Sequence, residues 1–338
     1  MQRKLSEISS FEVILCLSVV LIHLLSESID AYEKGTILSI LSFSVSKMMT
    51  FVVPAFVISS GIKFAHKFEH GQFSYLSFMK GRILRIYLPY VFFSVVYYLY
   101  FVFYRRYFDF DLGALSNYIL YGSIAAPFYF IALIMQFYIL SPIIMLFCRV
   151  IPANLGTILA AAVNIACIYF FKDLRYNDRL FTSYILYWVI GCYIGMDFRI
   201  SMSRLTRRKK SLIIAGMFFT VVYVLCSYLE FMSVYQHFFT EILKIAFCLS
   251  ASFMYLVSMP KSVGFFAGEL APVTFGIYLI HCLVIFETQS IMDKSGITST
   301  PLRFVIAFFT VYIISLLISV LYIKIKHLFD RLVKRNQW

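Results

Sequence analysis

The sequence predicts an all-α integral membrane protein, a polytopic bundle of about ten transmembrane helices with both termini in the cytoplasm. Three observations predict it. The 338 residues are 61% hydrophobic and 14% charged, with a mean hydropathy of +0.84, whereas a soluble domain is about half apolar and a quarter charged. The length accommodates about ten segments of ~20 apolar residues. The basic residues gather on alternate connections between those segments.

The apolar segments define the expected spans. We expect them at residues 9–27, 36–62, 86–104, 127–148, 154–171, 181–198, 211–229, 238–258, 265–289 and 304–323. The first span carries Glu12 and His23 within its apolar run, which a cleavable signal peptide would not, so we expect it to be retained. Because no linker, low-complexity tract or repeat divides the chain, we expect a single transmembrane domain over residues 1–338.

The distribution of Lys and Arg predicts the orientation. With the amino terminus inside, 20 of the 30 lie on cytoplasmic segments and eight on external ones, and Lys47 and Lys244 lie within spans. Cytoplasmic loops of membrane proteins carry such an excess. The connections expected outside are residues 28–35, 105–126, 172–180, 230–237 and 290–303. The net charge of +13 therefore indicates membrane orientation and contact with anionic lipid, and we expect no nucleic acid partner.

The seven cysteines all fall inside apolar segments, without the paired spacing of a zinc site. Cysteine is a common small buried residue. We therefore expect neither a disulfide framework nor a bound metal.

Polar and ionisable side chains inside spans cost a few kcal/mol each, so they are candidates for function. These residues are Glu12, His23, Lys47, Gln136, Lys244, Glu269, His281 and Glu287. Three of them, Lys244, Glu269 and Glu287, lie near span ends, where a side chain that reaches the interface is the simpler explanation.

The two histidines lie at matching depths. His23 is about fourteen residues along one outward-running helix and His281 about sixteen along another, so both reach the outer half of the bilayer. Two imidazoles at one depth would line one cavity; the alternative is that each is a hydrogen-bonded interior histidine. Glu12 precedes His23 by three helical turns and shares its face, ~16 Å away.

Two arginines, Arg82 and Arg85, stand at the expected cytoplasmic mouth of the third span. Three residues apart on one helical face, their guanidinium groups would clamp a phosphate or pyrophosphate. Anchoring at the cytoplasmic surface explains them equally well.

Four segments carry motifs that occur together in one enzyme family. They are Glu12–His23 (EVILCLSVVLIH), Phe56–Gly61 (FVISSG), Phe78–Tyr90 (FMKGRILRIYLPY) and Phe275–His281 (FGIYLIH), with a weaker aromatic match at Phe128–Pro142. In this order they resemble the acyltransferase-3 family of membrane-bound O-acyltransferases. Within it, the chain is most similar to short members of the intercellular-adhesin branch, associated with poly-N-acetylglucosamine. The likeness extends from residue 7 to about 285.

The resemblance implies an enzyme of the cell membrane that moves an acetyl or succinyl group from cytoplasmic acyl-CoA to a hydroxyl of a cell-surface polysaccharide. It implies that His23 is the catalytic base or acyl carrier, and that Tyr278 and His281 orient the acceptor or the oxyanion. Arg82 and Arg85 would bind the CoA phosphates. Acyl-CoA would be a substrate, with no tightly bound cofactor; the partners implied are membrane lipid, the extracellular glycan and a polysaccharide synthase.

One departure from the family pattern is at position 12, where the family has an arginine and this chain has Glu12. Either the positive charge has moved to another helix, with Lys47 as the candidate, or transfer activity is altered or lost. Two other functions therefore stay open: an exporter or flippase of a glycan or lipid-linked sugar, and a membrane sensor of a small ligand. The sensor interpretation lacks an output domain.

Overall fold

The structure, a computed structural model, describes residues 5–71, 73–171, 173–233, 237–258, 268 and 270–335. It is 86% helical, and the described part contains no strand. Nine helices within that part are long and apolar enough to cross a membrane, or ten if one bent pair forms a single span. The prediction of an all-α polytopic membrane protein is therefore confirmed.

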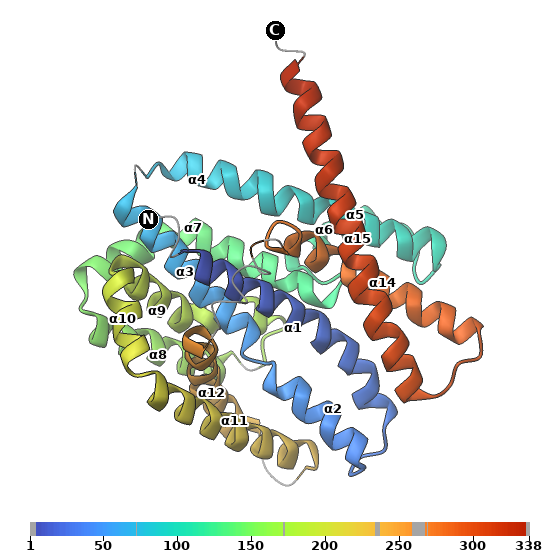
Figure 1. Cartoon of the computed structure of the whole chain (residues 1–338), viewed down its shortest axis with the longest axis horizontal. Coiled ribbons are helices and arrows are strands. Elements are labelled where there is room, and N and C mark those ends of the chain that lie inside the picture. The colour runs from blue at the N-terminus through green and yellow to red at the C-terminus, as the bar shows by residue number, and fades with distance from the viewer. Residues whose placement is uncertain are drawn as a thin grey trace. The chain divides into compact units, whose positions relative to one another are not determined.

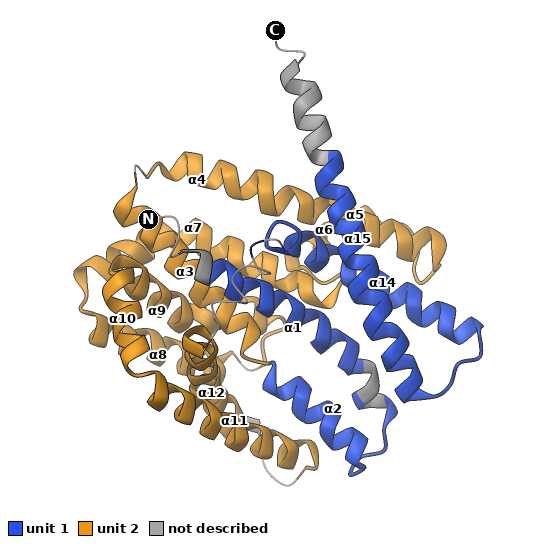
Figure 2. Ribbon diagram, in the orientation of Figure 1, with its two compact units in different colours: residues 1–49, 260–338 blue, residues 50–259 orange. Residues whose placement is uncertain are grey.

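The chain divides into two compact units, coloured separately in Figure 2. Unit 1 comprises residues 1–49 and 260–338, and unit 2 comprises residues 50–259. Unit 1 thus brings together the two ends of the sequence, which carry the two histidines.

Within the described residues, unit 1 contains four α-helices with printed bounds, which Figure 1 labels. They are α1 (Leu5–Ala31), α2 (Ile37–Met48), α14 (Thr274–Lys294) and α15 (Thr300–Arg335). Helix α1 packs against each of the other three, and α14 also packs against α15. Residues 265–267 and Glu269 of the expected span 265–289 lie outside the described residues. The helix of this region, α14, begins at Thr274 and runs to Lys294.

Unit 2 contains the other α-helices that the structure describes. They are α3 (Val52–His70), α4 (Tyr75–Arg82), α5 (Leu88–Leu99), α6 (Leu112–Tyr121), α7 (Tyr129–Val150), α8 (Ala153–Phe170), α9 (Ile185–Met196), α10 (Phe198–Arg207), α11 (Lys209–Phe231) and α12 (His237–Ser258). Its closest packing is between α3 and α9. A Cβ atom on Gly191 would overlap the Ile58 carbonyl, and one on Gly195 would overlap the Ile62 carbonyl. Small residues let two backbones approach in this way in membrane bundles.

The expected span 36–62 is not one helix. It breaks at Met49–Phe51, where α2 ends and α3 begins, and α3 continues to His70. Hydropathy does not resolve this break, because the apolar run is continuous across it.

The third expected span, 86–104, begins earlier than predicted. A continuous helical segment runs from Tyr75 to Tyr104 and includes π-helical turns at Ile83–Tyr87 and Tyr100–Tyr104. Pro89 follows the first of these turns. Proline lacks the N–H of an ordinary helical turn and clashes with the preceding turn, and the wider turn accommodates it. Arg85 therefore lies inside the long helix, at a wide turn.

The connection 105–126, expected as a loop, contains helix α6. The Asp111 side chain caps its first turn by accepting a hydrogen bond from Gly113 N at 2.7 Å, and Gly122 ends it in the left-handed conformation. These are the residue types that begin and end helices. The expected span 181–198 corresponds to a helix over Phe181–Met196, after which the chain bends by 106° into α10.

Candidate functional site

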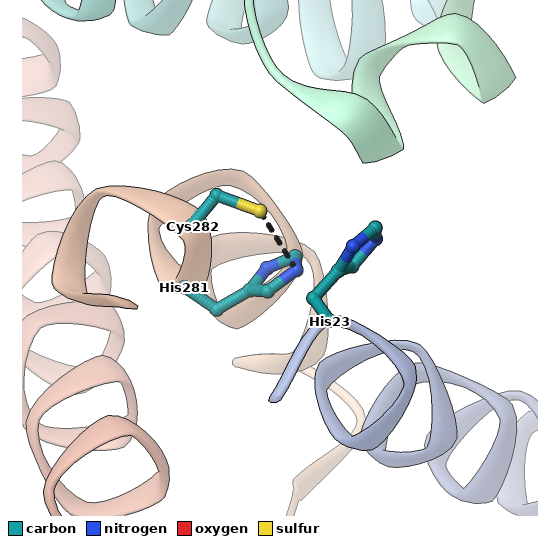
Figure 3. A group of neighbouring side chains, drawn as sticks. All are labelled: His23, His281 and Cys282. Atoms are coloured by element: carbon teal, nitrogen blue, oxygen red, sulfur yellow. Dashed lines mark hydrogen bonds between the residues drawn. The ribbon is translucent and has the colours of Figure 1, made fainter. Parts of the chain in front are cut away.

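Helices α1 and α14 bring His23 and His281 together in unit 1. Their ring centroids lie 5.4 Å apart, and the ring planes are inclined at 36°. The His281 side chain is fully buried and His23 is half-buried. Figure 3 shows the His23 ring, which comes from α1, beside the His281 ring, which comes from α14. The two imidazoles thus lie side by side, as expected from their matched depths.

Two side chains, one on α1 and one on α15, fix this arrangement by hydrogen bonding to backbone carbonyls. The Cys16 thiol on α1 donates to the Thr274 carbonyl in the first turn of α14, at 3.2 Å. The Tyr312 hydroxyl on α15 donates to the Leu17 carbonyl of α1, at 2.7 Å. Both bonds are one to two helical turns below His23 along α1. They tie α1 to the helices that flank it.

The His281 ring has a polar neighbour at each nitrogen. Its Nδ1 lies 3.1 Å from the Ile277 carbonyl, one turn earlier in α14. Its Nε2 lies 3.4 Å from the sulfur of Cys282. A carbonyl oxygen accepts hydrogen bonds only, so Nδ1 carries the proton and Nε2 presents its lone pair.

Tyr278 shares a face of α14 with His281, as their spacing predicted. The two ring centroids are 6.2 Å apart. The Tyr278 ring also stacks on Phe275, with the planes within 9° of parallel. This stacking restricts the orientation of the phenol beside the imidazole pair.

Gly276, the glycine of the segment that resembles the family motif, has a packing role. A Cβ atom at this position would lie 2.8 Å from the Ser319 Oγ and 3.0 Å from the Ser319 Cβ on α15. Such distances are too short for a side chain, so the glycine allows α14 and α15 to approach closely. Gly276 lies in the turn below His281 and helps to set the position of α14.

Glu12 and Lys47 also belong to unit 1. Glu12 is half-buried on α1, and the Lys47 ammonium on α2 lies 5.3 Å from the centre of the Phe43 ring. The short connection between α1 and α2 makes them antiparallel neighbours. His23 precedes the end of α1 by eight residues and Lys47 follows the start of α2 by ten. These rises, ~12 and ~15 Å, give the two side chains similar depths.

The two arginines lie in unit 2 and differ in environment. The Arg82 guanidinium is half-buried between the rings of Phe78 and Tyr138, 4.9 and 4.8 Å from their centres. Arg85, on the π-helical turn, is exposed. In a π-helical turn each residue rotates less about the axis than in an α-helix, so the two side chains diverge more than ordinary helical spacing predicts. Arg82 is held in place, whereas Arg85 is accessible.

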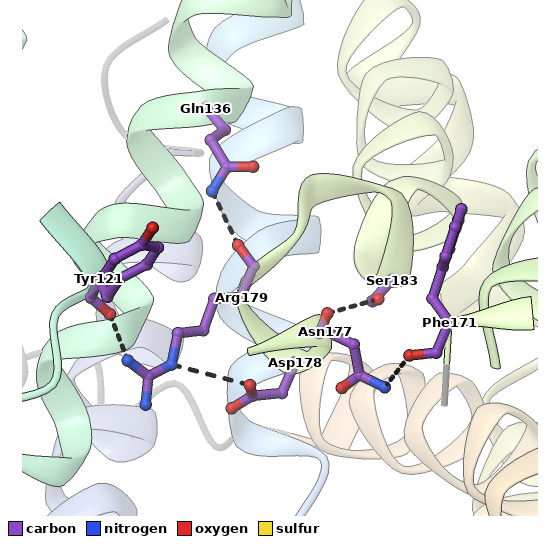
Figure 4. Close-up of polar contacts among 7 residues, drawn as sticks. All are labelled: Tyr121, Gln136, Phe171, Asn177, Asp178, Arg179 and Ser183. Atoms are coloured by element: carbon purple, nitrogen blue, oxygen red, sulfur yellow. Dashed lines mark hydrogen bonds and ion pairs between the residues drawn. The ribbon is translucent and has the colours of Figure 1, made fainter. Parts of the chain in front are cut away.

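Gln136 on α7 binds the segment that precedes α9 (Figure 4). Its amide donates to the Arg179 carbonyl at 2.8 Å and accepts from Phe181 N at 3.1 Å. The Arg179 side chain in turn donates to the Tyr121 carbonyl at the end of α6, at 2.5 Å. Gln136, a polar residue within an apolar span, thus holds the irregular segment before α9 in place. Its own hydrogen-bonding groups are satisfied by that segment.

Sequence reasoning missed Cys282 as a member of the histidine site. No two cysteines of the chain have the spacing of a metal site, so the cysteine pattern alone does not indicate Cys282. The available signal was different: a cysteine directly after a histidine that was already a candidate.

Comparison with known protein families agrees with the motifs. A profile of the acyltransferase domain matches residues 6–320, nearly the whole chain and parts of both units. Searches of curated proteins and of solved structures gave no significant match. The chain therefore belongs to the acyltransferase-3 family and is a multi-pass membrane protein of that family.

Proposed function

We propose that this protein is a membrane O-acyltransferase that moves an acetyl or succinyl group from cytoplasmic acyl-CoA to a hydroxyl of a cell-surface polysaccharide or related glycan. The observation that carries the proposal is the pair of imidazoles, His23 and His281, 5.4 Å apart inside a chain of this family. The polysaccharide acceptor rests on the resemblance to the intercellular-adhesin branch.

In the proposed reaction, His23 accepts the proton of the acceptor hydroxyl while the oxygen attacks the thioester carbonyl. The C–O bond forms, the C–S bond breaks, and the CoA thiolate takes the proton that His23 received. Histidine suits this role because a neutral imidazole has one nitrogen whose lone pair can accept a proton. In the alternative sequence of steps, the acyl group passes first to a nitrogen of His23 and then to the hydroxyl. Both sequences require a free lone pair on His23.

His281 and Tyr278 have positioning roles in this proposal. The bond from Nδ1 of His281 to the Ile277 carbonyl fixes the ring. The ring, fixed beside His23, then orients the acceptor hydroxyl. The Tyr278 phenol, held by Phe275, donates to the oxyanion that develops on the thioester carbonyl.

The donor is recognised by Arg82 and Arg85 in unit 2. A guanidinium forms strong, charge-assisted hydrogen bonds with phosphate. Arg85 is exposed and free to turn toward the nucleotide phosphates, and Arg82 adds a fixed positive charge. The 20-to-8 distribution of basic residues supports a cytoplasmic location for both arginines and for both termini, in the cell membrane.

Lys47 supplies the positive charge that Glu12 does not. The family arginine would stand at position 12, near one end of α1, whereas Lys47 lies at about the depth of His23 on the adjacent helix. A cation at that depth favours the thiolate and oxyanion that form during transfer.

The test is transfer of label from acetyl-CoA and from succinyl-CoA to cell-surface polysaccharide in cells with and without the protein. We expect label on the polysaccharide only when the protein is present. If polysaccharide reached the surface in the protein's presence, stayed inside in its absence and carried no label in either case, the exporter interpretation would replace this one.

A further inference from the structure

Three potential metal ligands meet at the imidazole pair. One atom each from His23, His281 and Cys282 can be chosen so that all three lie within 4.8 Å of one another. Figure 3 shows that they come from two helices, His23 from α1 and the other two from consecutive positions of α14. His281 and Cys282 are buried, with 0% and 5% of their surfaces exposed. Nitrogen and sulfur donors in a buried site are the set that Zn²⁺ and Cu⁺ prefer.

The orientation of His281 suits a metal ligand. Its Nδ1–H donates to the Ile277 carbonyl, which leaves the Nε2 lone pair directed toward Cys282. Metal-binding histidines are commonly fixed in this way, by a hydrogen bond from the second nitrogen to a carbonyl. The hydrogen bond to the Ile277 carbonyl therefore already holds the His281 ring in the orientation that a metal ligand needs.

The distance from the His281 nitrogen to the Cys282 sulfur is 3.4 Å. In a tetrahedral zinc site, Zn–S and Zn–N bonds of about 2.3 and 2.0 Å separate the two ligand atoms by about 3.5 Å. This pair thus already has the spacing of two zinc ligands. The three ligand atoms lie up to 4.8 Å from one another. For all three to bind one zinc ion, the longest of these separations must shorten by roughly 1.3 Å. Rotation of the His23 ring, which is half-buried, supplies a movement of this size.

We propose that His23, His281 and Cys282 bind one Zn²⁺ ion, and that this ion inhibits the enzyme. On binding, the Cys282 thiol releases its proton to water, both imidazoles stay neutral, and one Zn–S and two Zn–N bonds form, with a water as fourth ligand. No oxidant or reductant is needed. The sequence alone predicted no metal, because it does not show that Cys282 and His23 lie on either side of His281.

Inhibition of acyl transfer by zinc follows from competition for the lone pair of the His23 imidazole, and this part of the proposal rests on the proposed function. A neutral imidazole has one nitrogen with a lone pair and one that carries a proton. When zinc occupies that lone pair on His23, the ring can neither accept the hydroxyl proton nor carry an acyl group. Zinc binding and acyl transfer therefore exclude each other, and the enzyme would respond to free zinc at the membrane surface.

Cobalt reports on the site without any assay of activity. Purified protein in nanodiscs is treated with a chelator, exchanged into metal-free buffer and titrated with Co²⁺, whose thiolate complexes absorb in the near ultraviolet. We expect one equivalent of Co²⁺ to produce this band in the wild type and one equivalent of Zn²⁺ to remove it. The band should be absent in Cys282→Ser. In His23→Ala, the apparent affinity for Co²⁺ should fall at least about tenfold.

The matched control is Cys16→Ser. Cys16 is another buried thiol of unit 1, but its sulfur is engaged with the Thr274 carbonyl. This variant should retain the cobalt band. A band that survives Cys282→Ser, or a wild type that produces none, would overturn the proposal.

The inhibitory effect is measured separately. Each variant is compared with its own chelator-treated rate, so that a change in basal activity does not matter. Zinc should suppress transfer by the wild type and by Cys16→Ser at the concentrations that displace cobalt. If zinc displaced cobalt and left the rate unchanged, inhibition would be ruled out. If instead the chelator-treated wild type transferred no acyl group, the proposed function would fail while the cobalt result stood on its own.

Discussion

The imidazole rings of His23 and His281 lie 5.4 Å apart, although they come from helices near opposite ends of the sequence. Both belong to unit 1, and the packing of α1, α14 and α15 determines their separation. A shift of about 1 Å in catalytic groups can cost two orders of magnitude in rate. Residues that position these helices should therefore affect activity even when they do not touch substrate.

Gly276 is the clearest residue of this kind. In Gly276→Val, the added side chain would collide with Ser319 and push α14 away from α15. Overpacking costs about 1–3 kcal/mol, so we expect a lower midpoint of thermal unfolding in detergent, together with reduced transfer activity.

Gly81→Ala is the control for this prediction. Gly81 is also helical, but a Cβ atom there would have no neighbour within 4 Å. Alanine should leave the midpoint unchanged or raise it slightly, because it favours the helix. Equal midpoints for Gly276→Val and the wild type would contradict the packing role of Gly276.

Arg85→Ala should impair the use of the donor. Loss of one charge-assisted phosphate contact costs ~1.5–3 kcal/mol, so the apparent KM for acyl-CoA should rise roughly tenfold or more while the KM for the acceptor stays constant. Steady-state kinetics at varied acyl-CoA measures this change.

Arg204→Ala provides the comparison, because Arg204 is an exposed arginine of α10 with the same anchoring potential. Its donor KM should equal that of the wild type. If the variant lacking both Arg82 and Arg85 had the same KM for acyl-CoA as the wild type, neither arginine would bind the donor, and both would be explained as membrane anchors.

Gln136→Ala should loosen the segment before α9. The substitution removes the amide bonds to Arg179 and Phe181, a loss of ~1–3 kcal/mol when the backbone groups stay buried. We expect a lower unfolding midpoint and faster tryptic cleavage after Arg175 or Arg179. Asn117→Ala, at an exposed amide on α6, should change neither quantity; the same cleavage rate in both variants would show that Gln136 does not hold this segment.

Cysteine labelling tests the orientation. A membrane-impermeant thiol reagent applied to intact cells should label Asn117→Cys, in the connection expected outside, and should label Thr206→Cys only after permeabilisation. Both positions are exposed, and six of the seven native cysteines are buried, so the background should be low. The reverse pattern would place the donor and acceptor on the opposite sides of the membrane.

Hydropathy was sufficient to predict most of the fold, because a bilayer requires about 20 apolar residues per span and leaves few other solutions. It did not predict the break between α2 and α3 or the helix α6. Both depend on local caps and turns rather than on mean hydropathy. The early start at Tyr75 was missed for a related reason: the basic residues around Arg82 resemble a loop, although they continue the helix.

The site was predicted in part. The positions of His23 and His281 along their spans predicted that both lie at the same depth in the membrane, because a helix rises by a fixed amount per residue. The rotation of each helix about its axis depends on tertiary packing, so the sequence alone did not place Cys282 at the same site. Likewise, the contact of Gln136 with Arg179 joins residues 43 positions apart, and no local pattern predicts it.

The central claim is that His23 carries out the chemistry of acyl transfer. The most direct measurement is the rate of acyl transfer by His23→Ala, compared with His281→Ala and with His70→Ala, an exposed histidine of α3. Loss of a general base costs ~10²–10⁴ in rate, so His23→Ala should fall below about a hundredth of the wild-type rate at normal protein level. His281→Ala should be reduced less, and His70→Ala should match the wild type. A His23→Ala rate above about a tenth of the wild-type rate would contradict the account.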